Sequence, residues 1–296
     1  MDARVRVACA QVEPVAFDLS GTLEKLASTA ADAAAQGAQL VLFPETFIPV
    51  YPSSRWVRAL AAGGGKDVWA RLARASLTVP SAETDFIGSV AAKHGLVVAV
   101  GANELDGATL YNTLLVFGAD GELVLRHRKL VPTNHERLVW GMGDGGGLAT
   151  IDTPLGRVGG LICWENFMPL ARAALYQSKL DIYLAPTADD SESWHDSIRH
   201  IARESRSFVL SCCVLQRASS YPDDVDVADG PDLLGRGGSA IVAPNGTYLA
   251  GPLWDEEGVL VAELDPDLLF AERQRFDAAG HYSRPDVLRL EVTPLR

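Results

Sequence analysis

Three residues of different chemical types lie at the ends of apolar segments that read as strands. Cys163 and Glu45 each follow such a segment directly, and Lys129 lies near the end of a third. A nucleophilic hydrolase needs these groups, because a carboxylate can take the thiol proton and a cation can offset charge that develops on the substrate. Each also has a simpler explanation: a packed core cysteine, a carboxylate that ends a strand, and an exposed charge on an edge strand.

The segment around Cys163 predicts a sharp turn from a strand into a helix. Small residues and a short apolar run precede the cysteine, and Pro169 suits the first turn of a helix that continues to Tyr176. A nucleophile on such a turn stands clear of its neighbours. The N-terminus of a helix can also lower the pKa of a thiol. We therefore expect Cys163 to be the nucleophile, with a lowered pKa.

The elements around these residues alternate between strands and helices, and hairpin turns recur. Residues 5–12 read as a buried strand, and residues 21–36 read as a helix. Residues 239–242 and 259–264 read as a final antiparallel set, and residues 208–215 read as one strand. This mixture favours two sheet layers with helices outside over a purely parallel, doubly wound sheet.

The composition limits the class of protein. The 296 residues are 48% hydrophobic and carry a formal net charge of -12, which argues against a nucleic-acid or anionic-membrane partner. No segment resembles a signal peptide or a membrane span of roughly 20 apolar residues. We expect a single domain over residues 1–296, with an extended tail from about residue 277.

The cysteines and histidines predict neither a disulfide framework nor a metal site. The four cysteines form no CxxC pair, and Cys212 and Cys213 are expected on alternate faces of one strand. A reducing cytoplasm is therefore the expected compartment. The six histidines show no HExxH motif. The glycine-rich residues 141–147 fit GxGxxG literally, but they precede a strand and do not open a helix, so we expect no dinucleotide cofactor.

Several motifs together resemble the nitrilase superfamily of carbon–nitrogen hydrolases. The order Glu, Lys, Cys matches the family, and the resemblance covers nearly the whole chain. The three principal motifs are Phe43-Pro44-Glu45-Thr46-Phe47, His127-Arg128-Lys129-Leu130-Val131-Pro132-Thr133 with Glu136-Arg137, and Cys163-Trp164-Glu165-Asn166. The resemblance implies a four-layer αββα sandwich, with two mixed sheets and helices outside. It also implies a homodimer or higher homo-oligomer that packs helix against helix.

The resemblance also implies a role for each residue of the site. Glu45 would be the base, Lys129 the cation and Cys163 the nucleophile, with no metal or organic cofactor. Glu136 would support the site by orienting Lys129 or the substrate; its simpler role is a salt bridge with Arg137. For the walls of the substrate pocket we expect Trp164, Tyr51 and His135, although core packing or a surface position would also suit these residues.

The residues after the nucleophile indicate the branch of the superfamily. Trp164-Glu165-Asn166 is similar to the block found in enzymes that act on nitriles, whereas amidase-type relatives commonly carry another pair. We therefore expect a nitrilase that forms a carboxylic acid and ammonia through thioimidate and thioester intermediates. The alternatives are an aliphatic amidase or N-carbamoyl amide hydrolase with the same three residues, and a catalytically silent binding protein.

Overall fold

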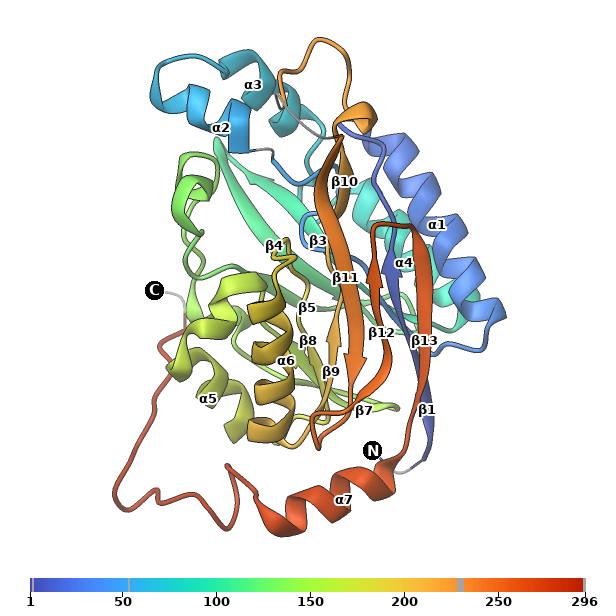
Figure 1. Cartoon of the computed structure of the whole chain (residues 1–296), viewed down its shortest axis with the longest axis vertical. Helices are drawn as coiled ribbons and strands as arrows, with labels where there is room; N and C mark the ends of the chain where they lie inside the picture. The colour runs from blue at the N-terminus through green and yellow to red at the C-terminus, as the bar shows by residue number, and fades with distance from the viewer. Residues whose placement is uncertain (2, 53, 228–231, 295–296) are drawn as a thin grey trace.

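Two mixed β-sheets lie face to face in the computed structural model, which describes residues 1, 3–52, 54–227 and 232–294 (Figure 1). The first sheet has the strand order β13 (Gly258–Leu264), β1 (Val5–Gln11), β2 (Leu40–Leu42), β3 (Val97–Asp106), β4 (Thr109–Phe117) and β5 (Leu123–Arg128). The second has the order β10 (Leu215–Arg217), β11 (Leu233–Val242), β9 (Phe208–Ser211), β8 (Ile182–Leu184), β7 (Gly156–Gly160) and β6 (Ile151–Thr153), and β12 (Tyr248–Trp254) pairs with β11.

Helices cover the outer face of each sheet. The first sheet packs against α1 (Leu19–Ala35) and α4 (Ala82–His94), and the second against α5 (Pro169–Gln177) and α6 (Glu192–Ser205). At one end of the molecule lie α2 (Ser54–Ala61) and α3 (Lys66–Arg74), and at the other α7 (Pro266–Arg275) (Figure 1). The layers therefore run helix, sheet, sheet, helix, which confirms the predicted αββα sandwich. Among the described residues, no helix combines the length and apolarity needed to cross a bilayer.

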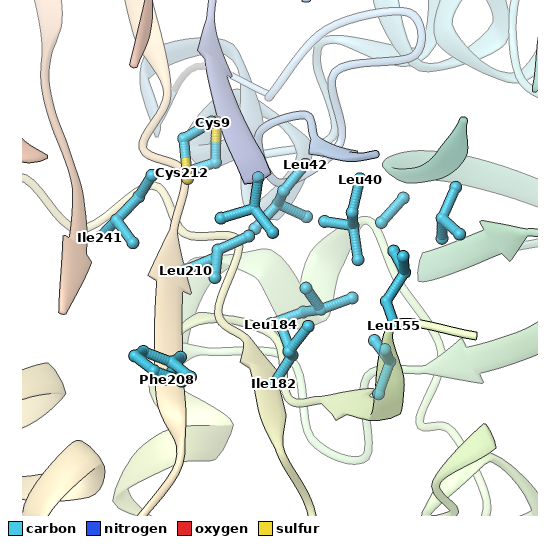
Figure 2. Close-up of a cluster of buried hydrophobic side chains, with 14 of the residues drawn as sticks. Cys9, Leu40, Leu42, Leu155, Ile182, Leu184, Phe208, Leu210, Cys212 and Ile241 are labelled. Atoms are coloured by element: carbon cyan, nitrogen blue, oxygen red, sulfur yellow. The ribbon is translucent and has the colours of Figure 1, made fainter. Parts of the chain in front are cut away.

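The strand residues alternate between two hydrophobic clusters, as the period of two requires. In β1, Val7 and Cys9 point between the sheets, whereas Ala8 and Ala10 point toward the helices. Figure 2 shows the cluster between the sheets, where side chains of β2 and β8 meet and Cys9 lies beside Cys212. Burial on both faces explains why most residues of β1, β2 and β8 are apolar.

Two expectations about strands are wrong. Residues 208–215 are not one strand, because the chain leaves β9 to bond with Thr187: the Thr187 amide donates to the Cys212 carbonyl at 3.0 Å, and the Val214 amide to the Thr187 carbonyl at 2.8 Å. Cys212 and Cys213 lie in this break. The final antiparallel set is also divided, since β12 occupies the position beside β11, and β13 crosses to the other sheet to pair with β1.

Candidate active site

The edge formed by the carboxyl ends of the parallel strands gathers the predicted residues. Strands β2 and β3 are parallel, and β5 has the same direction because two antiparallel pairings separate it from β3. Glu45 follows β2 and Lys129 follows β5, so both leave the first sheet at the same edge. Cys163 follows β7 of the second sheet. Open α/β sheets commonly place their ligands at such an edge.

The carboxylate of Glu45 is fully buried and hydrogen-bonded at both oxygens. Its Oε1 accepts from Lys129 Nζ at 2.8 Å and from Asn112 Nδ2 at 2.7 Å, and its Oε2 accepts from the Ala188 amide at 2.7 Å. Asn112 lies on β4, between β3 and β5. Its backbone carbonyl also accepts a hydrogen bond from the Lys129 backbone amide at 2.7 Å. One asparagine therefore positions both members of the ion pair.

Lys129 lies between two carboxylates. Its Nζ donates to Glu136 Oε2 at 2.8 Å as well as to Glu45. Glu136 also accepts from the Tyr51 hydroxyl at 2.6 Å and from the Thr133 amide at 2.6 Å. Its expected alternative partner, Arg137, instead donates to the Pro132 carbonyl at 3.0 Å. Glu136 therefore contacts Lys129 and not the side chain of Arg137, and its supporting role in the site stays a prediction.

Cys163 is buried and has a backbone φ of 52°, a conformation that costs free energy in a residue with a side chain and is frequent at functional sites. Its amide donates to the Pro186 carbonyl at 2.8 Å, and its Sγ accepts from Thr187 Oγ1 at 3.1 Å. The residue after Thr187 is Ala188, whose amide binds Glu45. Two consecutive residues therefore bind the sulfur and the carboxylate and bring them to one place.

The pKa shifts follow from burial and from the surplus of negative charge. Burial, together with repulsion from Glu136, raises the pKa of Glu45 above its ordinary value, although Lys129 opposes the shift. Burial alone would lower the pKa of Lys129, but attraction to Glu45, Cys163 and Glu136 outweighs it and raises the pKa. Lys129 is therefore a cation, and Glu45 is a stronger base than an exposed glutamate.

The expectation of a lowered thiol pKa is wrong. Burial and the nearby charge of Glu45 raise the pKa of Cys163 well above its ordinary value. The residues after Cys163 form a short 3₁₀ helix (Cys163–Phe167), and α5 begins only at Pro169, so the thiol does not lie at the N-terminus of that α-helix. The resting thiol is protonated, and its proton must move to a base when the substrate arrives.

A buried set of hydrogen bonds around Glu165 connects the segments that carry Cys163 and Lys129. Glu165 accepts from the Ile162 amide at 2.8 Å and from the Leu130 amide at 2.5 Å, and its Oε2 lies 3.0 Å from His127 Nε2. Burial raises the pKa of Glu165, but His127 and the two amides outweigh it, so the pKa lies below its ordinary value. Sequence reasoning placed Glu165 in a family motif and missed this bridging role.

Two glycines let other backbone segments approach the site. A Cβ on Gly101 would lie 2.3 Å from the Pro44 carbonyl and 2.8 Å from Glu45 Cα. A Cβ on Gly143 would lie 2.1 Å from the Arg128 carbonyl, and the Gly143 amide donates to the Lys129 carbonyl at 2.8 Å. The glycine-rich segment 141–147 thus packs against the strand end that carries Lys129, which explains its composition without a nucleotide.

A pocket of about 520 Å³ opens beside these residues. Tyr51 and His135, both expected as walls, line it together with Ala188 and residues of α2. Trp164, the third expected wall residue, is not among the described residues that line the pocket. Trp164 is 49% exposed, and its Nε1 donates a hydrogen bond to Asp189 at 2.7 Å. In the described part of the chain, no group of three or more His, Cys, Asp or Glu side chains is arranged to hold a metal ion.

The fold and the arrangement of the site are those of a hydrolase that acts on carbon–nitrogen bonds. The chain belongs to the carbon-nitrogen hydrolase family, whose model matches residues 6–274. It is 43% identical to an aliphatic nitrilase of Sinorhizobium fredii (98% of this chain, 96% of that protein) and 42% identical to nitrilase 2 of Arabidopsis thaliana (97% and 88%). The solved structure of Saccharomyces cerevisiae Nit3, a member of branch 10 of the nitrilase superfamily, has the same fold (TM-score 0.75, 21% identity, 95% and 97% covered).

Proposed function

We propose that this protein is a nitrilase that converts an organic nitrile into a carboxylic acid and ammonia. The observation that carries the proposal is the set of hydrogen bonds linking Glu45, Lys129 and the Thr187-Ala188 segment that binds Cys163. These contacts occur in a chain that is more than 40% identical to two nitrilases over nearly its whole length. A buried base, a cation and a thiol are the groups that addition to a cyano carbon requires.

The first half of the reaction forms a thioimidate. As the cyano group approaches, Glu45 takes the proton of the Cys163 thiol, and the sulfur forms a bond to the nitrile carbon. The nitrogen gains negative charge, which Lys129 and the Trp164 backbone amide stabilise, and it accepts from Glu45 the proton that left the thiol, so that Glu45 is again a carboxylate. Because the resting thiol is neutral, proton transfer and attack are coupled, and the buried Glu45 carboxylate is suited to receive the proton.

The second half consumes two water molecules. One adds to the thioimidate carbon, and collapse of the tetrahedral intermediate expels ammonia and leaves a thioester on Cys163. The other, activated by Glu45, attacks the thioester, breaks the carbon–sulfur bond and releases the carboxylic acid while the thiol regains its proton. Glu136 keeps Lys129 in place throughout, because it binds the same ammonium from the other side.

The test is ammonia release by the purified protein from a nitrile and from the amide of the same acid. We expect release from the nitrile, and we expect Cys163→Ala and Glu45→Gln each to abolish it while circular dichroism shows a folded protein. Activity on the amide alone would instead support the amidase alternative. Full activity in Cys163→Ala would refute the proposed chemistry, and ammonia release from neither the nitrile nor the amide would favour a silent binding protein.

A further inference from the structure

The inner end of the pocket does not favour an anionic group. There the walls Tyr51 and Ala188 donate hydrogen bonds to Glu136 and Glu45, which together carry two carboxylates against the single ammonium of Lys129. In this buried environment an additional negative charge would be repelled. A neutral cyano group is compatible with this end, whereas a carboxylate of the substrate is not.

Three other lining residues, here called the rim, are basic. These are Arg55 and Arg58 of α2, and His135. Arg55 Nε forms a 2.6 Å ion pair with Asp226, whereas Arg58 is exposed and makes no ion pair with any residue that the structure describes. Arg58 therefore gives the rim a positive charge that Asp226 does not neutralise, in a chain whose net charge is -12. Such a local field attracts and orients anionic ligands.

His135 adds an unsatisfied polar atom to the same rim. Its Nε2 is buried and has no hydrogen-bond partner among the described residues. Burial lowers the pKa of His135 below its ordinary value, and Arg58 and Lys129 act in the same direction although Glu136 opposes them, so the neutral ring is favoured. A neutral imidazole can donate one hydrogen bond. Because a buried polar atom without a partner costs free energy, a ligand oxygen at this position would be stabilised.

From these features, and resting on the proposed nitrilase activity, we infer that the natural substrate is a nitrile that carries a carboxylate at the end remote from the cyano group. Arg58 and His135 Nε2 bind the carboxylate at the rim, and the chain extends inward until the cyano carbon reaches Cys163. The wall beside Glu45 and Glu136 disfavours an anion and Arg58 attracts one, so together they select the direction in which the substrate binds. A pocket of about 520 Å³ is of the size that small-molecule ligands fill.

The experiment compares unbranched ω-cyanocarboxylates of increasing chain length with uncharged alkyl nitriles of the same length. We expect kcat/KM of purified protein to favour the carboxylate at the best chain length by roughly tenfold or more, since hydrogen bonds to charged groups contribute that much. The preference should decrease as ionic strength rises. An equal or lower kcat/KM for every carboxylate would refute the inference and leave the proposed nitrilase activity intact.

Variants assign the preference to the rim. Arg58→Gln should reduce the ratio of kcat/KM values (carboxylate over alkyl nitrile) roughly tenfold, mainly through KM, and Arg58→Lys should restore part of it. The matched control is Arg74→Gln, an exposed arginine in the last turn of α3 that does not line the pocket; its ratio should equal that of the wild type. An unchanged ratio in Arg58→Gln would refute the inference. Ammonia release from neither class of nitrile would refute the proposed function instead.

Discussion

At the scale of single residues, the charge balance around Lys129 sets the strength of the base. Three ionisable side chains share a site without solvent: Glu45, Lys129 and Glu136. Lys129 favours the ionised form of Glu45, whereas Glu136 disfavours it. The pKa of Glu45 therefore depends on both neighbours, and a change at Glu136 must affect the acid side of the activity profile.

Glu136→Gln should move the acid limb of kcat/KM to lower pH. Glu45 must be ionised to accept the thiol proton, so activity falls as pH decreases through its pKa. The variant lacks the negative charge of Glu136, whose repulsion raises the pKa of Glu45. Lys129 then forms an ion pair with Glu45 only. Both changes lower the pKa of Glu45. We also expect kcat to fall roughly tenfold or more, because Lys129 is less well oriented.

The measurement is kcat/KM from ammonia release at closely spaced pH values. Glu122→Gln, which removes an exposed carboxylate next to β5, serves as the control and should leave the acid limb unchanged. An acid limb of Glu136→Gln at the wild-type pH or above it would contradict the assigned charge balance.

The type of residue revealed the reacting groups but not their partners. Glu45, Lys129 and Cys163 were identified because a charge or thiol at the end of an apolar segment is unusual. Asn112 gave no such signal, because a single amide within a strand is ordinary and only the approach of distant segments gives it its contact. Thr187 lies in a segment, residues 185–189, that also resembles the nitrilase branch, but its contact with the sulfur was not predicted. The raised pKa of Cys163 was likewise hidden, because burial and the distance to Glu45 are properties of the fold.

At the scale of elements, Glu165 connects the turn that carries Cys163 to the strand end that carries Lys129. Glu165→Gln should therefore reduce both stability and turnover. The glutamine side chain keeps one oxygen that can accept a hydrogen bond, but its NH₂ group faces a backbone N–H that needs an acceptor. His127 also loses the carboxylate that it contacts. A buried donor left without its acceptor costs about 1–3 kcal/mol of unfolding free energy.

Urea unfolding and kcat measured on the same preparation test this bridge. Turnover should fall even at temperatures where Glu165→Gln is fully folded, because Cys163 and Lys129 are no longer linked. Glu122→Gln, at an exposed site, should match the wild type in both measurements. Wild-type kcat in a folded Glu165→Gln would show that the bridge contributes to stability alone.

Gly101 is the place where β3 approaches the Glu45 turn, and Gly101→Ala should displace that turn. The added Cβ would lie 2.5 Å from the Thr46 amide and 2.3 Å from the Pro44 carbonyl, both of them backbone atoms. We expect kcat to fall roughly a hundredfold and the unfolding free energy to fall by about 1–3 kcal/mol. Gly64→Ala is the control, because its nearest contact is an ordinary 3.4 Å. Equal kcat in the two variants would contradict this account.

At the scale of the whole molecule, local pattern predicted the layers but not the order of the strands. The buried strand at residues 5–12 and the helix at residues 21–36 were predicted from the sequence and correspond to β1 and α1. The pairing of β13 with β1 was not, because those strands are separated by most of the chain and both are apolar. Helices α2 and α3 were also missed; both are short, and the glycine run 63–65 between them favours a loop.

The sequence led us to expect that copies of the chain pack helix against helix, and we predict that the exposed apolar residues at the start of α5 form this contact. Leu170 at the start of α5 is 70% exposed, and Trp164 and Phe167 beside it are 49% and 43% exposed. Apolar side chains grouped in this way are typical of protein–protein contacts.

We predict that Leu170→Glu lowers the mass measured by light scattering after size exclusion to that of one chain, because the new charge would be buried without a partner. Phe270→Glu on α7, also exposed, lies at the other end of the molecule (Figure 1) and should leave the mass unchanged. A wild-type mass of one chain, or an oligomer that survives Leu170→Glu, would exclude this face as the contact.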